Sequence, residues 1–327
     1  MSVCQNPYVK NRMVQTRKLK SKYKLREKPK LTKDFRLYDI QYEKPVNKDL
    51  AVGLVYFNSS KSTRILMNYL YTVAKLNLAG IPNYTLEMYE KKPELSDVFY
   101  VKTDIILFQK ERLCHLLEKK IPKQFTKLLF LDCDVIFDRK NWYNDLSKML
   151  DTYEVIHPFS KTCRLDLTYK KCLEFGDAIG TYPQHKKEIK MNPGYAWAFQ
   201  RKWFVDKGFY QYAILGGGDI CSARPWVKAI HTKHIDSKNY GSQSMNEYVS
   251  KVGDPKVGFL DGLIYHLFHG SVRNRQWGTR YQILKDFKDP RDATKETKEG
   301  ILTIKNKTLK SKIREYFARR DDDGIEE

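Results

Sequence analysis

The chain has 327 residues, 41% of them hydrophobic and 13% aromatic, which is enough to bury a substantial core and excludes a largely disordered binder. Its 60 Lys and Arg against 39 Asp and Glu give a net charge of +21, a field that attracts nucleic acid, anionic lipid or phosphorylated small molecules without choosing among them. The six cysteines lie far apart, and neither a signal-peptide core nor an apolar run of membrane-spanning length is found, so we expect reduced thiols in a cytoplasmic protein without structural zinc.

Residues 1–48 form a basic segment whose lysines and arginines concentrate between Arg17 and Lys30, with few apolar residues among them. Such a composition is typical of a solvated arm. The alternative is an arm that docks on an anionic membrane or polymer surface. In either case the segment is predicted to lie outside the folded domain.

The folded part is predicted to begin with a strand, a helix and a second strand. Leu50–Phe57 is a continuous apolar run of strand length that ends in the turn-prone Asn58-Ser59-Ser60. From Thr63 to Ala79 apolar residues recur every three or four positions, which predicts a helix capped by Ser62. The second strand follows at Tyr84–Met88. This order implies a right-handed crossover and a mainly parallel sheet.

The alternation continues along the chain. Further predicted elements are a strand, a helix and two strands: Val98–Val101, Ile105–Lys119, Leu128–Leu131 and Val155–Ile156. Lys161–Met191 shows no clear period, and we interpret it as a surface excursion that selects the acceptor. After one large domain over residues 49–286, residues 287–327 are predicted to form an extension with an amphipathic helix at Leu309–Arg319 and an acidic tail.

Two carboxylates follow the apolar strand at Leu128–Leu131. Asp132 and Asp134 are two positions apart in extended chain, so both point the same way at the carboxyl end of a buried strand, where open α/β sheets bind ligands. Both are candidate ligands for Mn²⁺ or Mg²⁺, with one carboxylate binding the ion and the other a bound water or a ribose hydroxyl. The alternative is an acidic turn without a ligand.

A phosphohydrolase is the second enzyme class that such a pair allows, with the first carboxylate as nucleophile and the second as acid. That arrangement normally opens the first strand of its fold and carries a hydroxyl residue shortly afterwards. Here the pair follows at least two strand–helix units, and Val135-Ile136-Phe137 comes next. The hydrolase therefore ranks second.

A third carboxylate, Asp219, follows the run Gly216-Gly217-Gly218, whose backbone can approach a sugar or acceptor closely. Asp219 is the candidate base that removes the proton of the acceptor hydroxyl in an inverting transfer. Its alternative role is the N-cap of a helix over Ile220–Ile230. Trp197 could stack on the apolar face of a sugar, although its residue type favours packing in the core.

A histidine and two arginines complete the candidate site. His269 stands beside Gly270 and is followed by Arg273 and Arg280. A neutral imidazole can complete the coordination of a cation, and guanidinium groups bind diphosphate oxygens in pairs. His269 is preferred over His266 as a metal ligand.

Taken in chain order, Asp132-Cys133-Asp134, Asn192–Ala198, Gly216–Asp219 and His269-Gly270 resemble the motifs of GT-A glycosyltransferases. The resemblance covers residues 50–286, and it extends more narrowly to a group of soluble bacterial and large-DNA-virus enzymes. It implies the α/β class, with a single Rossmann-like domain whose mainly parallel central sheet is flanked by helices.

The resemblance also implies roles for individual residues. The metal ion is held through Asp134 and His269, and Asp132 lies near the ribose. The nucleoside contacts Phe57-Asn58 after the first strand, and Asp104 is a further nucleoside candidate. For Asn58 and Asp104 the alternatives are turn formation and helix capping.

The predicted function is Mn²⁺- or Mg²⁺-dependent transfer of a hexosyl or pentosyl group from a UDP- or GDP-sugar to a glycan or glycoprotein acceptor. Asp219 stands alone, whereas the family usually has an acid directly after paired glycines and often another beside it. Inversion is therefore favoured, with a retaining enzyme as the alternative. The non-enzymatic alternative is a basic nucleic-acid-binding protein, against which the carboxylates argue because an acidic pocket repels phosphate unless a cation intervenes.

Overall fold

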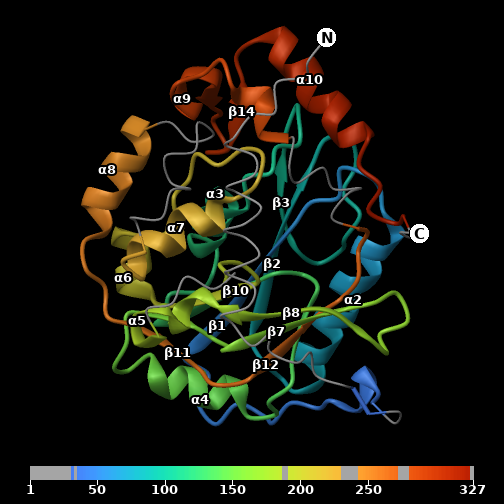
Figure 1. Ribbon diagram of the computed structural model, residues 1–327, viewed down its shortest axis with the longest axis vertical. Helices are drawn as coiled ribbons and strands as arrows, with labels where there is room; N and C mark the ends of the chain where they lie inside the picture. Colours follow the sequence, from blue (N-terminus) through green and yellow to red (C-terminus); the bar gives the residue numbers. More distant parts are fainter. Residues whose placement is uncertain (1–30, 33–34, 186–190, 230–241, 272–279, 325–327) are drawn as a thin grey trace, which may run out of the picture.

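The computed structural model describes residues 31–32, 35–185, 191–229, 242–271 and 280–324. At its centre lies a seven-stranded sheet in the order β11-β6-β10-β4-β1-β2-β3 (Figure 1). Its strands are β1 (Leu50–Tyr56), β2 (Asn83–Tyr89), β3 (Phe99–Lys102), β4 (Lys127–Leu131), β6 (Val155–His157), β10 (Ala196–Gln200) and β11 (Val257–Phe259). Within the described sheet β10 alone runs against its neighbours, and the other pairs are parallel. The predicted α/β class with a mainly parallel central sheet is confirmed.

Helices cover both faces of this sheet. They include α2 (Thr63–Leu78), α3 (Lys110–Glu118), α4 (Trp142–Met149), α6 (Arg201–Asp206), α7 (Gly218–Trp226) and α8 (Ser242–Val252). Ala51 and Val55 of β1 pack in one core cluster with residues of α3, α6, α7 and α8. Leu50, Val52 and Leu54 pack in a second cluster with residues of α2 and α4. Burial on both faces explains why β1 is apolar without alternation. None of the helices in the described ranges combines the length and the apolar character that a bilayer crossing requires.

The predicted strand–helix–strand unit is confirmed. The Oγ of Ser62 accepts a hydrogen bond from the N–H of Ile65 at 3.1 Å and caps α2. The next helix was placed too early, since α3 begins at Lys110 and not at Ile105. Ile105 and Leu107 instead pack with the C-terminal part of the chain, where hydrophobic burial overrides helix formation.

A second, five-stranded sheet has the order β5-β12-β7-β8-β9. Its strands are β5 (Val135–Phe137), β7 (Lys161–Leu165), β8 (Cys172–Ala178), β9 (Met191–Asn192) and β12 (Leu263–His266). The prediction of a surface excursion over Lys161–Met191 is therefore wrong for β7 and β8. Both strands carry many polar residues, and their pairing shifts register between Arg164 and Leu165, which removes the regular alternation that would have predicted them.

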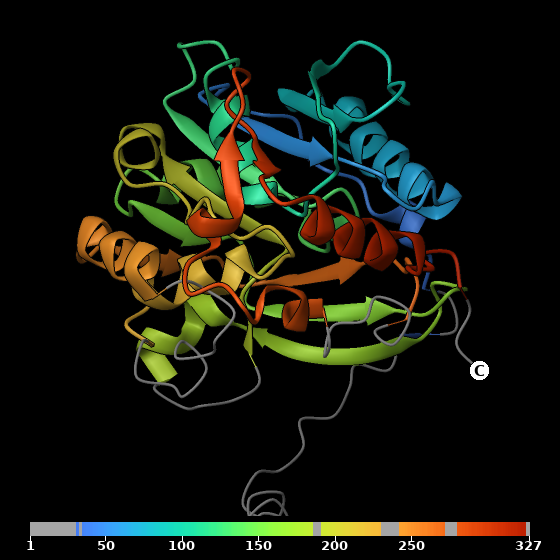
Figure 2. The same ribbon diagram turned by 90° about the horizontal axis from the view of Figure 1, so that it is seen from above.

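The C-terminal part packs on the edge of the molecule near β3. It contains η3 (Arg280–Leu284), α9 (Pro290–Ala293), the hairpin of β13 (Thr294–Glu296) and β14 (Leu302–Ile304), and α10 (Lys307–Ala318). As predicted, α10 is amphipathic, and its buried Leu309 and Ile313 pack with Ile105 and Leu215. After α10 the chain returns to the start of α2 (Figures 1 and 2). The acidic tail is thus part of the packed structure up to its last described residues.

The described part of the predicted arm also packs on the body. Leu37, in η1 (Leu37–Asp39), is 7% exposed, and the ring of Phe35 lies 5.0 Å from that of Tyr265. Lys75 of α2 donates to the carbonyl of Ile40 at 2.6 Å. The expectation of a solvated arm therefore does not hold for this stretch. The basic cluster from Arg17 to Lys30 lies outside the described residues.

Candidate active site

A cleft of about 520 Å³ lies at the carboxyl ends of β1 and β4. Its walls come from the loop after β1, the turn after β4, the segment before β10 and the chain after β12. Pockets of this size hold small organic ligands, and this one sits at the sheet edge where open α/β sheets bind them.

The turn Asp132-Cys133-Asp134 joins the two sheets, because β4 ends before it and β5 begins after it. The N–H of Asp132 donates to the carbonyl of Tyr195, and the N–H of Leu267 donates to the carbonyl of Asp134, both at 2.8 Å. The hydroxyl of Thr72 donates to the carbonyl of Cys133 at 3.0 Å. These three bonds fix the backbone of the turn that carries both carboxylates.

Asp134 lies against two imidazole rings. Its Oδ2 is 3.1 Å from Nε2 of His269 and 3.4 Å from Nε2 of His266. Pairing of β12 with β5 sets His266 opposite Val135 and so brings the end of β12 beside the turn. The structure brings together the two ligands that the resemblance implies and adds His266, which the sequence ranked lower.

The chemistry of this group fits a metal ion. Burial would raise the pKa of the Asp134 carboxyl, but the imidazoles of His266 and His269 outweigh burial and hold that pKa well below its ordinary value. Oδ1 of Asp134 is buried without a hydrogen-bond partner among the described residues. One carboxylate with an orphaned oxygen and two imidazole nitrogens form a donor set for a divalent transition metal.

Asp132 has a different partner. Its Oδ1 lies 2.9 Å from Nζ of Lys110, and it does not belong to the metal-binding group formed by the described residues. Burial disfavours the Lys110 ammonium, but Asp132, Glu111 and Asp219 outweigh burial and raise the pKa of Lys110 well above its usual range. The structure therefore separates Asp132 from Asp134, His266 and His269, and of the two carboxylates of the turn only that of Asp134 lies in this group.

Asp219 lies in the first turn of α7 and lines the cleft. Its carboxylate accepts the N–H of Ile220 at 2.8 Å and rests on the backbone of Gly194, where a Cβ would collide with it. The N-cap is Gly217, with a φ of 82°, so the N-cap alternative for Asp219 is wrong. A glycine is required at that position because few other residues adopt this backbone conformation.

A fourth carboxyl group, that of Glu111, lies beside Lys110 at the start of α3. It is 2% exposed, and its Oε2 has no hydrogen-bond partner among the described residues. Burial raises its pKa to about 7, with Lys110 opposing the rise and Asp219 adding to it. Gly218 faces this side chain, and a Cβ there would collide with it. Gly217 lines the cleft, whereas Gly218 makes room for Glu111.

The first two residues of the loop after β1, Phe57 and Asn58, differ in position: Phe57 lies on the cleft and Asn58 is buried. Phe57 lines the cleft and packs edge-on against Phe108, with ring centroids 5.1 Å apart. Asn58 is 4% exposed; its Oδ1 accepts the N–H of Ser62 at 2.9 Å, and its Nδ2 donates to Glu94 at 3.1 Å. Asn58 thus has the turn-forming role that was its alternative.

Asp104 lies away from the cleft lining. Its Oδ1 accepts a hydrogen bond from the hydroxyl of Thr303 at 2.6 Å, and its Oδ2 pairs with Nζ of Lys310 at 2.5 Å. In this structure Asp104 ties β14 and α10 to the body, so neither a nucleoside contact nor a helix cap describes its position.

Two guanidinium groups lie along the cleft. Arg280 is 8% exposed, donates to the hydroxyl of Tyr281 at 2.7 Å and stacks near the ring of Phe108. Arg320 lies 5.8 Å from the same ring and also lines the cleft. Together with Lys110 they provide positive charge for an anionic ligand. Arg273 lies outside the described residues.

Trp197 is a core residue. It is 2% exposed, stacks on His157 with ring centroids 4.1 Å apart and donates from Nε1 to the carbonyl of Pro193 at 2.7 Å. A sugar could not stack on this ring without rearrangement, so the position of Trp197 corresponds to the core-packing alternative.

Sequence reasoning missed Lys110, Glu111 and Asp322. The first two were placed inside the predicted helix at Ile105–Lys119, although the polar start at Gln109 could have suggested a helix beginning there. Asp322 belongs to a run of acidic residues that looks solvated in sequence. All three line the cleft through contacts between distant parts of the chain, which no local pattern reports.

No protein-family model matches the chain, and no curated protein matches it in sequence. Among solved structures it is similar to Drosophila β-1,4-galactosyltransferase 7 in complex with manganese, UDP-Gal and xylobiose, at 11% identity, 65% coverage of this chain and a TM-score of 0.33. The chain spans 64% of that protein's length. It is also similar to Mycobacterium tuberculosis glucosyl-3-phosphoglycerate synthase with Mn²⁺, UDP-glucose and phosphoglyceric acid, at 10% identity, 79% and 83% coverage of the two chains and a TM-score of 0.39.

Proposed function

We propose that this protein is a GT-A-type glycosyltransferase that moves a sugar from a nucleoside-diphosphate sugar to an acceptor hydroxyl. The observation that carries the proposal is the group of Asp134, His266 and His269, which shares one cleft with Lys110 and Asp219. A metal-binding group, a positively charged side chain and a carboxylate on the cleft wall are the three parts that departure of a diphosphate and attack by a hydroxyl require.

Asp134, His266 and His269 would hold the divalent ion. When bound there, Mn²⁺ or Mg²⁺ would neutralise the charge that grows on the departing diphosphate. Two imidazole ligands favour manganese, because Mg²⁺ prefers oxygen ligands. Before the ion binds, the two imidazoles lower the pKa of the buried Asp134 carboxyl and so keep it ionised, as a metal ligand must be.

The donor half of the cleft would bind the nucleotide. Lys110 holds Asp132 in an ion pair, which leaves that carboxylate oriented to accept a hydrogen bond from a ribose hydroxyl. Phe57 offers an aromatic face or edge to the base. Arg280 would pair with diphosphate oxygens. The donor is a UDP- or GDP-sugar.

The acceptor half would supply the base. Asp219 lines the cleft next to Gly194 and can take the proton of the attacking hydroxyl, which corresponds to an inverting transfer. Arg164, Glu174 and Asn192 of the second sheet line the same cleft and offer polar contacts to a glycan or glycoprotein acceptor.

The phosphohydrolase alternative is less compatible with this geometry. It requires the second carboxylate of the turn to give up a proton, yet the imidazoles keep Asp134 ionised by lowering its pKa. Asp132, the required nucleophile, is paired with Lys110.

The proposal is tested by incubating the protein with Mn²⁺ and a panel of UDP- and GDP-sugars and scoring release of free nucleotide. We expect one donor to be hydrolysed, and Asp134→Ala to abolish the activity together with any Mn²⁺-dependent rise in melting temperature on nucleotide addition. Asp206→Ala, an exposed change in α6, is the control and should behave as wild type. Absence of any nucleotide effect on the wild type would argue against the proposal.

A further inference from the structure

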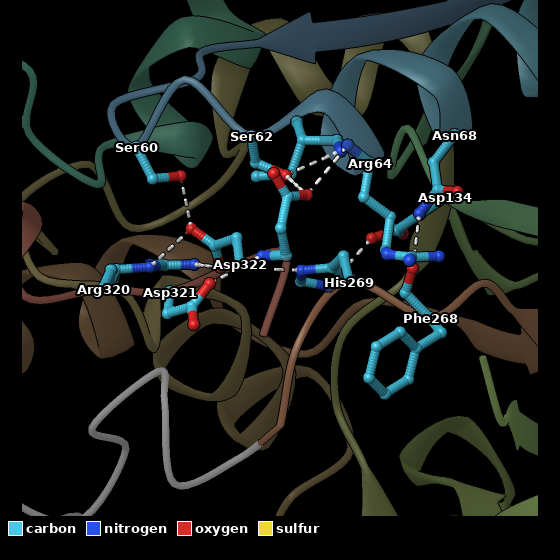
Figure 3. A network of polar contacts seen from close by, with 12 residues as sticks. Ser60, Ser62, Arg64, Asn68, Asp134, Phe268, His269, Arg320, Asp321 and Asp322 are labelled. Carbon is cyan, nitrogen blue, oxygen red and sulfur yellow. Dashed lines mark hydrogen bonds and ion pairs between the residues drawn. The ribbon is translucent and has the colours of Figure 1, made fainter. Parts of the chain in front are cut away.

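Among its described residues, the acidic tail after α10 contains one buried carboxylate. The side chain of Asp322 is 1% exposed, although the neighbouring Asp321 and Asp323 are exposed. Figure 3 shows Asp322 between Arg320, Ser60 and His269, on the side of the imidazole ring that faces away from Asp134. A run of charged residues near the end of a chain normally stays in solvent, so the burial of one member needs a cause.

Three groups from separate parts of the chain surround this carboxylate. Oδ1 lies 2.7 Å from Nη2 of Arg320, and Oδ2 accepts the hydroxyl of Ser60 at 2.7 Å. Oδ1 is also 3.8 Å from Nδ1 of His269, within the range of an ion pair. Nε of Arg320 also donates to Oδ2 at 3.1 Å, so the guanidinium contacts both oxygens of this buried carboxylate and balances its charge.

The tail is seated directly on the histidine segment. Gly270 has a φ of 82°, and a Cβ on it would lie 2.7 Å from the carbonyl oxygen of Asp321 and 3.0 Å from Cα of Asp322. Asp323 continues onto the first turn of α2, where its carboxylate accepts the N–H groups of Thr63 and Arg64, each at 3.0 Å. The tail therefore joins the loop after β1 to the segment that carries His269.

We propose that Asp322 is a positioning residue, which holds the imidazole of His269 so that its Nε2 faces the metal ion beside Asp134. The inference rests on the proposed function, because it takes Asp134, His266 and His269 as the ligands of the ion. Nε2 of His269 faces Asp134 at 3.1 Å, and Nδ1 on the other side of the ring faces Asp322. A carboxylate behind a metal-bound imidazole fixes the ring orientation and makes the imidazole a better ligand.

Arg320 and Ser60 hold Asp322 in place for this role. Both oxygens of the carboxylate are engaged, so its position is set by Arg320, just after α10, and by Ser60 in the loop after β1. Asp322 thereby contacts both the loop after β1, through Ser60, and the candidate metal ligand His269. A purely structural ion pair between Arg320 and Asp322 would stabilise the tail without affecting metal affinity, and the two roles can be separated by measurement.

The experiment compares Mn²⁺ affinity, measured by electron paramagnetic resonance of the free ion, in wild type, Asp322→Asn, Ser60→Ala and the control Asp321→Asn. Loss of an outer carboxylate of this kind weakens metal binding about 10- to 100-fold, and we expect that range for Asp322→Asn. Ser60→Ala keeps the carboxylate and should weaken binding by about threefold, whereas Asp321→Asn removes the same charge from an exposed neighbour and should stay within about twofold.

Two further measurements exclude a general loosening of the tail. The melting temperature of each metal-free variant reports stability, and the visible spectrum with Co²⁺ reports the geometry of the ligands. We expect the Co²⁺ bands to change in Asp322→Asn and to be retained in Asp321→Asn, with comparable metal-free melting temperatures. Should Asp322→Asn fail to fold, a weaker Mn²⁺ affinity in Ser60→Ala supports the inference and an unchanged one overturns it.

The outcome is distinguishable from failure of the proposed function. Equal Mn²⁺ affinities in Asp322→Asn and Asp321→Asn overturn the positioning role, even if wild type hydrolyses a nucleotide sugar. Conversely, if wild type binds Mn²⁺ in an Asp322-dependent way but acts on no nucleotide sugar, the transferase assignment fails and the positioning role stands.

Discussion

One ammonium group and three carboxyl groups lie together on the wall of the cleft. Burial alone would lower the pKa of Lys110, but the carboxyl groups of Asp132, Glu111 and Asp219 outweigh burial and raise it. Glu111, which is buried and lacks a hydrogen-bond partner for Oε2 among the described residues, has a pKa of about 7. The neutral form of Glu111 therefore limits the excess of negative charge in a place where burial makes that charge costly.

This raised pKa predicts a pH dependence of stability. Between pH 4.5 and about 7, Glu111 keeps its proton in the folded protein but loses it in the unfolded chain. The stabilising contribution of this proton is complete below pH 4.5 and disappears as the pH rises through about 7. Metal-free wild type should lose up to about 3 kcal/mol relative to Glu111→Gln between pH 5 and 8, measured by urea unfolding. Parallel pH profiles for the two proteins would contradict this assignment, and the exposed Glu315→Gln serves as control.

Asp219 allows a second prediction at this scale. Removal of a general base typically lowers the rate by about 10²- to 10⁴-fold, so Asp219→Asn should reduce kcat for transfer by that factor. Its Mn²⁺ affinity should be unchanged, because Asp219 does not belong to the metal-binding group of the described residues. The measurement is the transfer rate beside the Asp206→Asn control. A retained rate would favour a retaining mechanism without this base.

The N-terminus of α2 is capped twice. Ser62 binds the N–H of Ile65, and Asp323 binds those of Thr63 and Arg64. A helix start leaves four N–H groups without partners in the helix, and these contacts satisfy three of them. Ser62 belongs to the same turn, whereas Asp323 comes from the C-terminal tail. The cap by Asp323 also places negative charge at the positive end of the helix dipole.

Asp323→Ala should therefore lower the free energy of unfolding by about 1 kcal/mol at neutral pH. The hydrogen bonds from Ser62 and from the two N–H groups outweigh partial burial and lower the pKa of Asp323. Its contribution is present above the ordinary carboxyl pKa and is lost as the pH falls through the lowered one. Urea unfolding at pH 7 and in mild acid, with the exposed Asp206→Ala as control, measures the difference. Equal stabilities of the two variants at pH 7 would rule out the cap.

At the scale of elements, periodicity and burial decided which parts were predictable. β1, α2 and β4 were predicted because a strand buried on both faces is apolar throughout and an amphipathic helix has a period of 3.6. β7 and β8 were not, since polar residues and a register shift hide their alternation. The start of α3 was misplaced because apolar residues at Ile105 and Leu107 pack on the C-terminal part and imitate a helical turn.

For the whole molecule, motifs in sequence located the cleft but did not assign its contacts. Asp134 and His269 were candidates from sequence because each stands in a short motif beside a strand end or a glycine. The Lys110–Asp132 pair and the contact of Asp322 with His269 join residues that are 22 and 53 positions apart. Such pairs depend on how the two sheets and the tail meet, and no local pattern records that.

The candidate metal ligands Asp134, His266 and His269 also allow a prediction about the stability of the whole folded protein. A ligand that binds only the folded state at 100 times its Kd stabilises it by about 2.7 kcal/mol. Mn²⁺ should therefore raise the melting temperature, EDTA should reverse the rise, and Mg²⁺ at equal concentration should have a smaller effect because two of the three ligands are imidazoles. A stronger effect of Mg²⁺ would indicate that carboxylates dominate the site.

The reversed direction of β10 has a consequence for how the cleft could change in evolution. Because β10 runs against β4 and β6, the chain reaches the ligand edge of the sheet before entering the strand, and Asn192, Pro193, Gly194 and Tyr195 form part of the cleft wall on the way in. Insertions or deletions just ahead of this entrance would reshape what the cleft accepts while the strand register stays fixed. New ligand preferences could thus evolve there at small cost to folding.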